Sequence, residues 1–101
     1  MGNDIYINFD ASGGTITAAT YQNYALVYGK ADFEYSDDIS WVSDTVDKHD
    51  DGTGEIIFTA SENTDTRDGR SVDVDVKITL YSGQECNQKI HLCQPNKHQN
   101  N

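Results

Sequence analysis

The stretch Arg70-Ser-Val-Asp-Val-Asp-Val-Lys-Ile-Thr-Leu-Tyr81 alternates apolar and polar side chains from Val72 onward. Strict alternation over about ten residues is typical of a β-strand with one face buried and the other in water. In a helix of about 3.6 residues per turn, the same apolar side chains would scatter around the axis. β-branched residues also favour a pleated strand. The stretch predicts a long strand, and the rest of the chain must cover its apolar face, which consists of Val72, Val74, Val76, Ile78 and Leu80.

Shorter segments of similar character lie on both sides of this stretch. Apolar alternation or short apolar runs predict further strands, with glycine and polar turn residues between them. The polar, acidic residues 43–54 predict a long loop. No segment has helical periodicity, so we expect an all-β fold, an antiparallel β-sandwich of about seven or eight strands. The expected apolar segments are 4–9, 15–21, 24–28, 32–35, 39–42, 55–60 and 88–94.

Length and charge restrict the class of protein further. The 101 residues suit one domain, which we place at 3–95, with a polar tail or linker stub at 96–101. The net charge of −10 argues against binding to nucleic acid or to anionic lipid. No apolar run approaches the roughly 18 residues of a membrane-spanning helix, so we expect no membrane insertion. We also expect no cofactor and a monomeric state.

The two cysteines, Cys86 and Cys93, are expected to be unbonded. On one extended strand they would lie about 23 Å apart and face opposite sides of the sheet. Two cysteines do not supply the four ligands of a structural zinc site, and His91 does not complete one.

Five short motifs occur in order between Ile5 and Gln94. Together they resemble the BACON family (Bacteroidetes-associated carbohydrate-binding, often N-terminal). The resemblance implies an immunoglobulin-like sandwich of surface and secreted proteins of gut Bacteroidetes, beside glycoside hydrolases or other modules, with glycan or mucin as its ligand. It also implies an extracellular, cell-surface or periplasmic location. The motifs are Gly13-Gly14-Thr15, Ile39-Ser-Trp41-Val-Ser43, Glu62-Asn63, Arg70 and Ile90-His-Leu-Cys-Gln94.

Each motif also has a structural interpretation. Gly13 and Gly14 supply the positive φ of a turn, and Trp41 fills one end of a thin core. Asn63 bonds its own turn, while Arg70 clips the acidic turn that contains Glu62, Asp65 and Asp68. Gln94 satisfies backbone groups where the last strand ends. These motifs are therefore more indicative of the fold than of a binding site.

Aromatic side chains are the candidate glycan contacts, because aromatic rings stack on sugar faces. The candidates are Tyr21, Tyr24, Tyr28 and Trp41, with Tyr6 and Tyr81 also at outward positions. The alternative is that the tyrosines are ordinary cross-strand neighbours and that Trp41 is part of the core. Exposure and grouping of these rings distinguish the two interpretations.

Metal binding and catalysis are both disfavoured by the sequence. Aligned as an EF-hand loop from Asp47, the chain has His49 at the third position and Phe58 at the twelfth, so the bidentate glutamate is missing. A looser calcium site of Asp47, Asp50 and Asp51 stays open as an alternative, although we expect no metal. Carboxylates are abundant, but none lies in a context that forms a catalytic pocket, so we expect no enzyme.

The sequence thus predicts a non-catalytic accessory module that binds glycan or mucin and adjoins other domains of a parent chain. The alternative is a structural spacer that holds a neighbouring domain away from the cell envelope.

Overall fold

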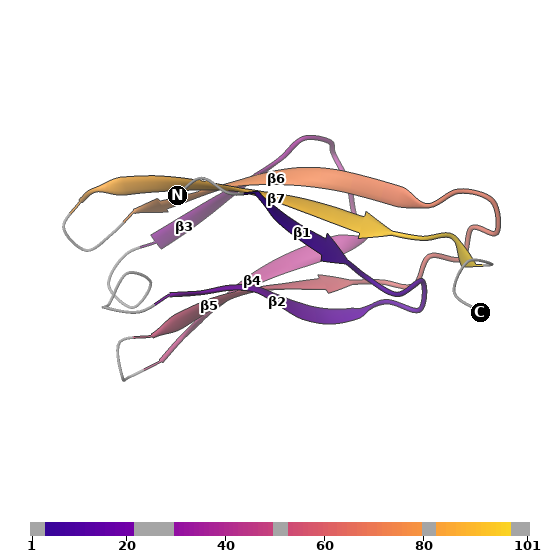
Figure 1. The fold of residues 1–101 in the computed structure, drawn as a ribbon, viewed down its shortest axis with the longest axis horizontal. Helices are drawn as coiled ribbons and strands as arrows, with labels where there is room; N and C mark the ends of the chain where they lie inside the picture. Colours follow the sequence, from indigo (N-terminus) through magenta and orange to yellow (C-terminus); the bar gives the residue numbers. More distant parts are fainter. Residues whose placement is uncertain (1–3, 22–29, 50–52, 80–82, 98–101) are drawn as a thin grey trace.

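The computed structural model describes residues 4–21, 30–49, 53–79 and 83–97, with the backbone alone at Tyr21 and Lys30. The described residues form seven strands in two stacked layers (Figure 1) and contain no α-helix, and hence none that could cross a membrane. The strands are β1 (Ile5–Asn8), β2 (Gly14–Tyr21), β3 (Lys30–Tyr35), β4 (Val42–Lys48), β5 (Gly54–Ala60), β6 (Arg70–Thr79) and β7 (Glu85–Gln94).

The strands form a four-stranded sheet in the order β1-β7-β6-β3 and a three-stranded sheet in the order β2-β5-β4. This arrangement confirms the all-β, immunoglobulin-like sandwich. The prediction that all pairs are antiparallel was wrong for β1, which runs parallel to β7 with Ile5 opposite Ile90. Because the chain crosses to the other sheet directly after β1, β1 and β2 are not a hairpin, and β1 pairs with the last strand instead.

β6 forms the centre of the larger sheet, between β7 and β3. The predicted buried stripe is confirmed from Val72 to Ile78, and Leu80 lies outside the described residues. Inward side chains of β5 meet this stripe across the sandwich, and those of β7 lie beside it in the same sheet. Full burial of one such side chain contributes about 1.5–3 kcal/mol to folding. The buried apolar residues are Ile7, Phe9, Ala11, Ile56, Phe58, Ala60, Val72, Val74, Val76, Ile78, Ile90 and Leu92.

The loop predicted for residues 43–54 was wrong, because Val42–Lys48 form β4 at the edge of the smaller sheet. Val42 and Val46 are its inward apolar residues, with Asp44 at the inward position between them. The Tyr35 hydroxyl donates a hydrogen bond to the Asp44 carboxylate. Burial and this carboxylate raise the pKa of Tyr35. The polar side chain of Asp44 therefore interrupts the apolar alternation that would have predicted β4 from the sequence. In the folded protein, the Tyr35 hydroxyl satisfies this carboxylate.

The C-terminal part of the chain departs from its predicted bounds. β7 begins at Glu85, earlier than the predicted 88, and carries both cysteines as free thiols. Asn96, expected in the tail, is buried, and its Nδ2 donates to the Arg67 carbonyl over 2.8 Å. Lys97 N donates to the Asp65 carbonyl over 2.8 Å. The folded unit therefore includes residues 96 and 97.

Candidate functional site

Three residues from the family-like motifs meet at one end of the sandwich. Gln94, only 2% exposed, accepts from Arg70 Nε over 2.6 Å and donates to the carbonyls of Ser61 (2.7 Å) and Asp10 (2.9 Å). The Arg70 guanidinium also lies 4.7 Å above the centre of the Trp41 ring. We call Trp41, Asn63, Arg70 and Gln94 the end cluster.

The remaining member of the end cluster, Asn63, ties the turn before β6 to the end of β7. Its Oδ1 accepts from Asp65 N over 3.1 Å, while its Nδ2 donates to the carbonyls of Asp68 (3.2 Å) and Pro95 (3.0 Å). Arg70 bonds to the carbonyls of Ser61 and Glu62, whereas the sequence suggested the acidic side chains of this turn. All these bonds join separate parts of the fold, so the end cluster stabilises this end of the sandwich.

The backbone that follows β5 explains the first glycine of the Gly13-Gly14 pair. Gly13 has a φ of +90°, and a Cβ there would lie 2.6 Å from the Ala60 carbonyl oxygen. A side chain at this position would therefore be strained and would collide with β5.

The aromatic residues proposed from the sequence do not form a described platform. Trp41 is half-buried, packs against the core and meets Phe9 edge-to-face at 6.5 Å between ring centres. Tyr21 ends β2, but its side chain, like all of Tyr24 and Tyr28, lies outside the described residues. Their part in ligand binding stays a prediction.

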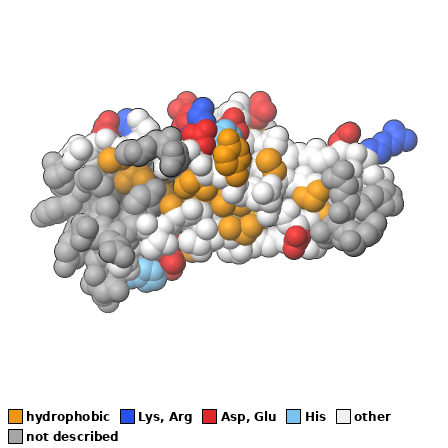
Figure 2. All heavy atoms as spheres, in the orientation of Figure 1, with side chains coloured by type: hydrophobic (Ala, Val, Ile, Leu, Met, Phe, Trp, Pro, Cys, Tyr) orange, Lys and Arg blue, Asp and Glu red, His pale blue; other side chains and the backbone are white. Residues whose placement is uncertain are grey.

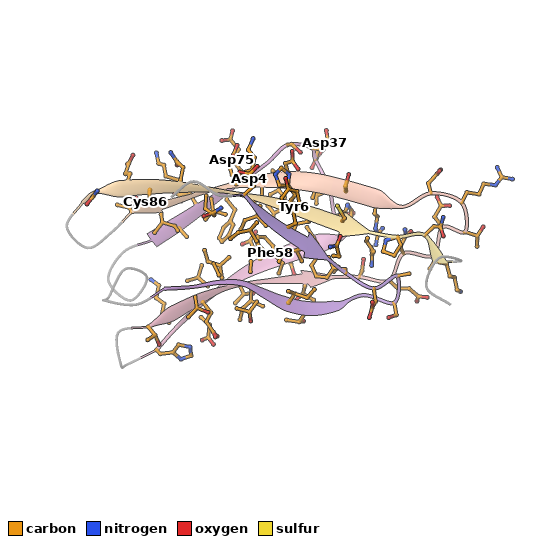
Figure 3. All side chains as sticks on the ribbon, in the orientation of Figure 1. Asp4, Tyr6, Asp37, Phe58, Asp75 and Cys86 are labelled. Atoms are coloured by element: carbon orange, nitrogen blue, oxygen red, sulfur yellow. The ribbon has the colours of Figure 1, made fainter. Side chains whose placement is uncertain are left out.

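The structure instead exposes a tyrosine on the first strand. Tyr6 is 68% exposed, and its ring stacks on the ring of His91 with 4.5 Å between centres and 17° between planes. The His91 ring covers one face of the Tyr6 ring, and the other face is exposed to water. Figure 3 shows Tyr6 on β1 and Asp4 near it, just before this strand begins.

Two carboxylates hold His91 beneath Tyr6. His91 Nδ1 lies 2.7 Å from Asp73 Oδ1, and Nε2 lies 2.9 Å from Asp4 Oδ2. The hydrogen bonds to Asp4 and Asp73 raise the pKa of His91. We call Asp4, Tyr6, Asp73 and His91 the Tyr6 face.

Strand register explains how residues so distant in sequence form the Tyr6 face. Tyr6 lies opposite His91 in the β1–β7 pair, and His91 lies opposite Asp73 in the β7–β6 pair. All three have the parity opposite to the buried stripe and therefore point outward. Parity alone placed Tyr6 and His91 on the outside, but only the parallel β1–β7 pairing brings them together.

Two hollows flank the Tyr6 face. One, of about 560 Å³, includes the next outward row, Asn8, Cys93 and Ser71, in its lining. The other, of about 340 Å³, lies beside Asp73 and is also lined by Asp75 and Lys89. Figure 2 shows charged and histidine side chains along the larger sheet, above hydrophobic side chains between the layers. The Tyr6 face is thus one part of a wider polar surface.

A second cluster lies where β4 and β5 meet. Ligand atoms of Asp47, His49 and Glu55 all lie within 4.8 Å of one another. The two carboxylates cannot supply the six to eight oxygen ligands that calcium takes. The other members of the calcium alternative, Asp50 and Asp51, lie outside the described residues.

The two sheets and their strand order define an immunoglobulin-like β-sandwich. No family model matches the chain, and no curated protein matches it. Among solved structures, that of mouse clustered PcdhgC3 EC1-3 is similar, with a TM-score of 0.52 and 8% sequence identity. The similarity covers 90% of this chain and 31% of that chain. At this identity the likeness shows the fold alone.

Proposed function

We propose that this chain is a non-catalytic accessory module that binds carbohydrate through the Tyr6 face. The open side of the Tyr6 ring is the observation that carries the proposal, since it is a flat apolar surface fixed in place by the His91 stack. Small-molecule sites combine such apolar surface with a few placed polar groups. Asp4 and Asp73 provide these groups, because a carboxylate can accept hydrogen bonds from sugar hydroxyls.

The state of His91 supports a binding role over a catalytic one. Both ring nitrogens face carboxylates at hydrogen-bond distance. A general base needs a free lone pair within reach of the proton that it removes. His91 has none, so it does not activate the nearby thiol of Cys93 or hydroxyl of Ser71.

We also propose that the module belongs to the BACON-like class of domains in surface or secreted bacterial proteins, next to other domains of a longer chain. The motif residues of that resemblance support the proposal, because Gly13, Trp41, Asn63, Arg70 and Gln94 act together at one end of the sandwich. The location outside the cell is part of the same proposal.

The spacer alternative rests on shape. The domain measures 47 × 24 × 22 Å, so it is long enough to separate two neighbours. A spacer needs no ligand, which makes the two functions separable by one binding experiment.

The test is a glycan array and a mucin pull-down with the isolated domain. We expect binding by the wild type, loss of binding with Tyr6→Ala, and retention with Tyr6→Phe, which keeps the ring. Tyr24→Ala tests the region proposed from the sequence in the same assay. Absence of binding to any glycan by the folded wild type would favour the spacer, and equal binding by Tyr6→Ala would exclude the Tyr6 face.

A further inference from the structure

Every described basic side chain on the outer surface of the larger sheet already faces a carboxylate. Lys77 Nζ lies 3.7 Å from Glu85 Oε2, and Lys89 Nζ lies 3.9 Å from Asp75 Oδ1. His91 is shared by Asp4 and Asp73. The described cations near the Tyr6 face are therefore already paired with carboxylates. An anionic ligand at this surface would be repelled by the acidic side chains.

The contacts of His91 with Asp73 and Asp4 indicate the protonation state of its ring. A neutral imidazole carries a hydrogen on one nitrogen only, so its second nitrogen would turn a lone pair toward a carboxylate oxygen. With 2.7 Å at Nδ1 and 2.9 Å at Nε2, two ionised carboxylates are both satisfied only when both nitrogens donate, so this geometry favours the imidazolium form of the ring. The protonated ring links β1, β7 and β6 through side chains.

We propose that the Tyr6 face binds an uncharged glycan, without sialic acid or sulfate, and that His91 is the positioning residue that holds Tyr6 and Asp4 for it. This inference rests on the proposed function and narrows its ligand. The side chains of Asp4 and Asp73 are 42% and 49% exposed, so oxygen atoms remain for sugar hydroxyls. The charge of −10 adds long-range repulsion of acidic sugars.

Loss of the His91 proton should disturb this arrangement. The charged or titratable groups around the ring are Asp4 and Tyr6 from the N-terminal strand, Asp73 and Asp75 from β6, and Lys89 and Cys93 from β7 itself. A neutral ring keeps one carboxylate contact and loses the other. β1 has only four residues and pairs with β7 alone, so the contact between His91 and Asp4 reinforces a short backbone pairing that positions Tyr6 and Asp4.

The experiment compares mucin before and after enzymatic desialylation, using binding titrations of the wild type. We expect binding to desialylated mucin and at least about tenfold weaker binding to sialylated mucin, because like charges would then be opposed. Equal or tighter binding of sialylated mucin would overturn the ligand class and leave the proposed function intact. Absence of binding to both forms, and to every glycan of the array, would overturn the proposed function and this inference with it.

A pH series then tests His91. NMR titration of the His91 ring in the free protein gives its pKa without any ligand. The affinity for desialylated mucin should fall as the pH rises, with its midpoint at that pKa. The same midpoint should appear in the Tyr6→Phe background, which lacks the phenol hydroxyl. His91→Gln should bind more weakly at pH 6 and show no such midpoint. A full pH response in folded His91→Gln would overturn the positioning role.

Discussion

Replacing Gln94 with leucine removes the central polar side chain of the end cluster at nearly constant volume. Three short hydrogen bonds disappear, those with Arg70 Nε and with the carbonyls of Asp10 and Ser61, together with a longer one of 3.4 Å to the Ala11 carbonyl. Each typical bond contributes about 1 kcal/mol net, and a bond to a charged group about 1.5–3 kcal/mol. We therefore expect Gln94→Leu to lower the free energy of unfolding by about 3–5 kcal/mol. For a domain of this size, that corresponds to a fall in Tm of at least about 12 °C.

Urea denaturation followed by Trp41 fluorescence is the suitable assay, because Trp41 is the only tryptophan and belongs to the end cluster. The midpoint should fall while the slope of the free energy with urea stays constant. Lys77→Ala is the control, since it removes only the exposed ion pair with Glu85 and should change stability by less than about 1 kcal/mol. A loss below about 1 kcal/mol for Gln94→Leu would refute the assignment of the end cluster as a stabilising element.

Three further predictions concern pH, metal and thiols. The pKa of His91 is raised in the folded state, so its contribution to stability is complete below the unfolded value of about 6.5 and is lost as the pH rises through the folded value. The difference in Tm between the wild type and His91→Gln should therefore shrink at alkaline pH; a constant difference would contradict the two-carboxylate geometry. EDTA should leave the Tm unchanged, and a fall of several degrees would indicate that Asp47, His49 and Glu55 bind a metal. A thiol assay in denaturant without reductant should find both Cys86 and Cys93 reactive, and finding none would contradict their placement on one strand.

Local pattern was enough to predict the fold class and its central strand. Alternation from Val72 to Ile78 records directly which side chains face the core, because successive side chains of a strand point to opposite sides. β4 was not predicted because its inward positions do not all carry apolar side chains. Its inward Asp44 has a polar side chain, and the hydroxyl that satisfies it belongs to Tyr35 on another strand.

The candidate site depends even more on long-range pairing. Asp4 and His91 are 87 residues apart and meet only because β1 pairs in parallel with β7. Nothing in the local sequence distinguishes Tyr6 from the other outward tyrosines. The structural role of Arg70 and Gln94 was predictable from their types and positions, but their direct bond across 24 residues was not.

The most direct test of the central claim is NMR mapping of the ¹⁵N-labelled domain during titration with neutral glycans released from desialylated mucin. The account predicts that the largest chemical-shift changes fall on Asp4, Tyr6, Asp73 and His91, and that Tyr6→Ala abolishes them. Shift changes centred on Trp41, or spectra that do not change at saturating glycan, would contradict it.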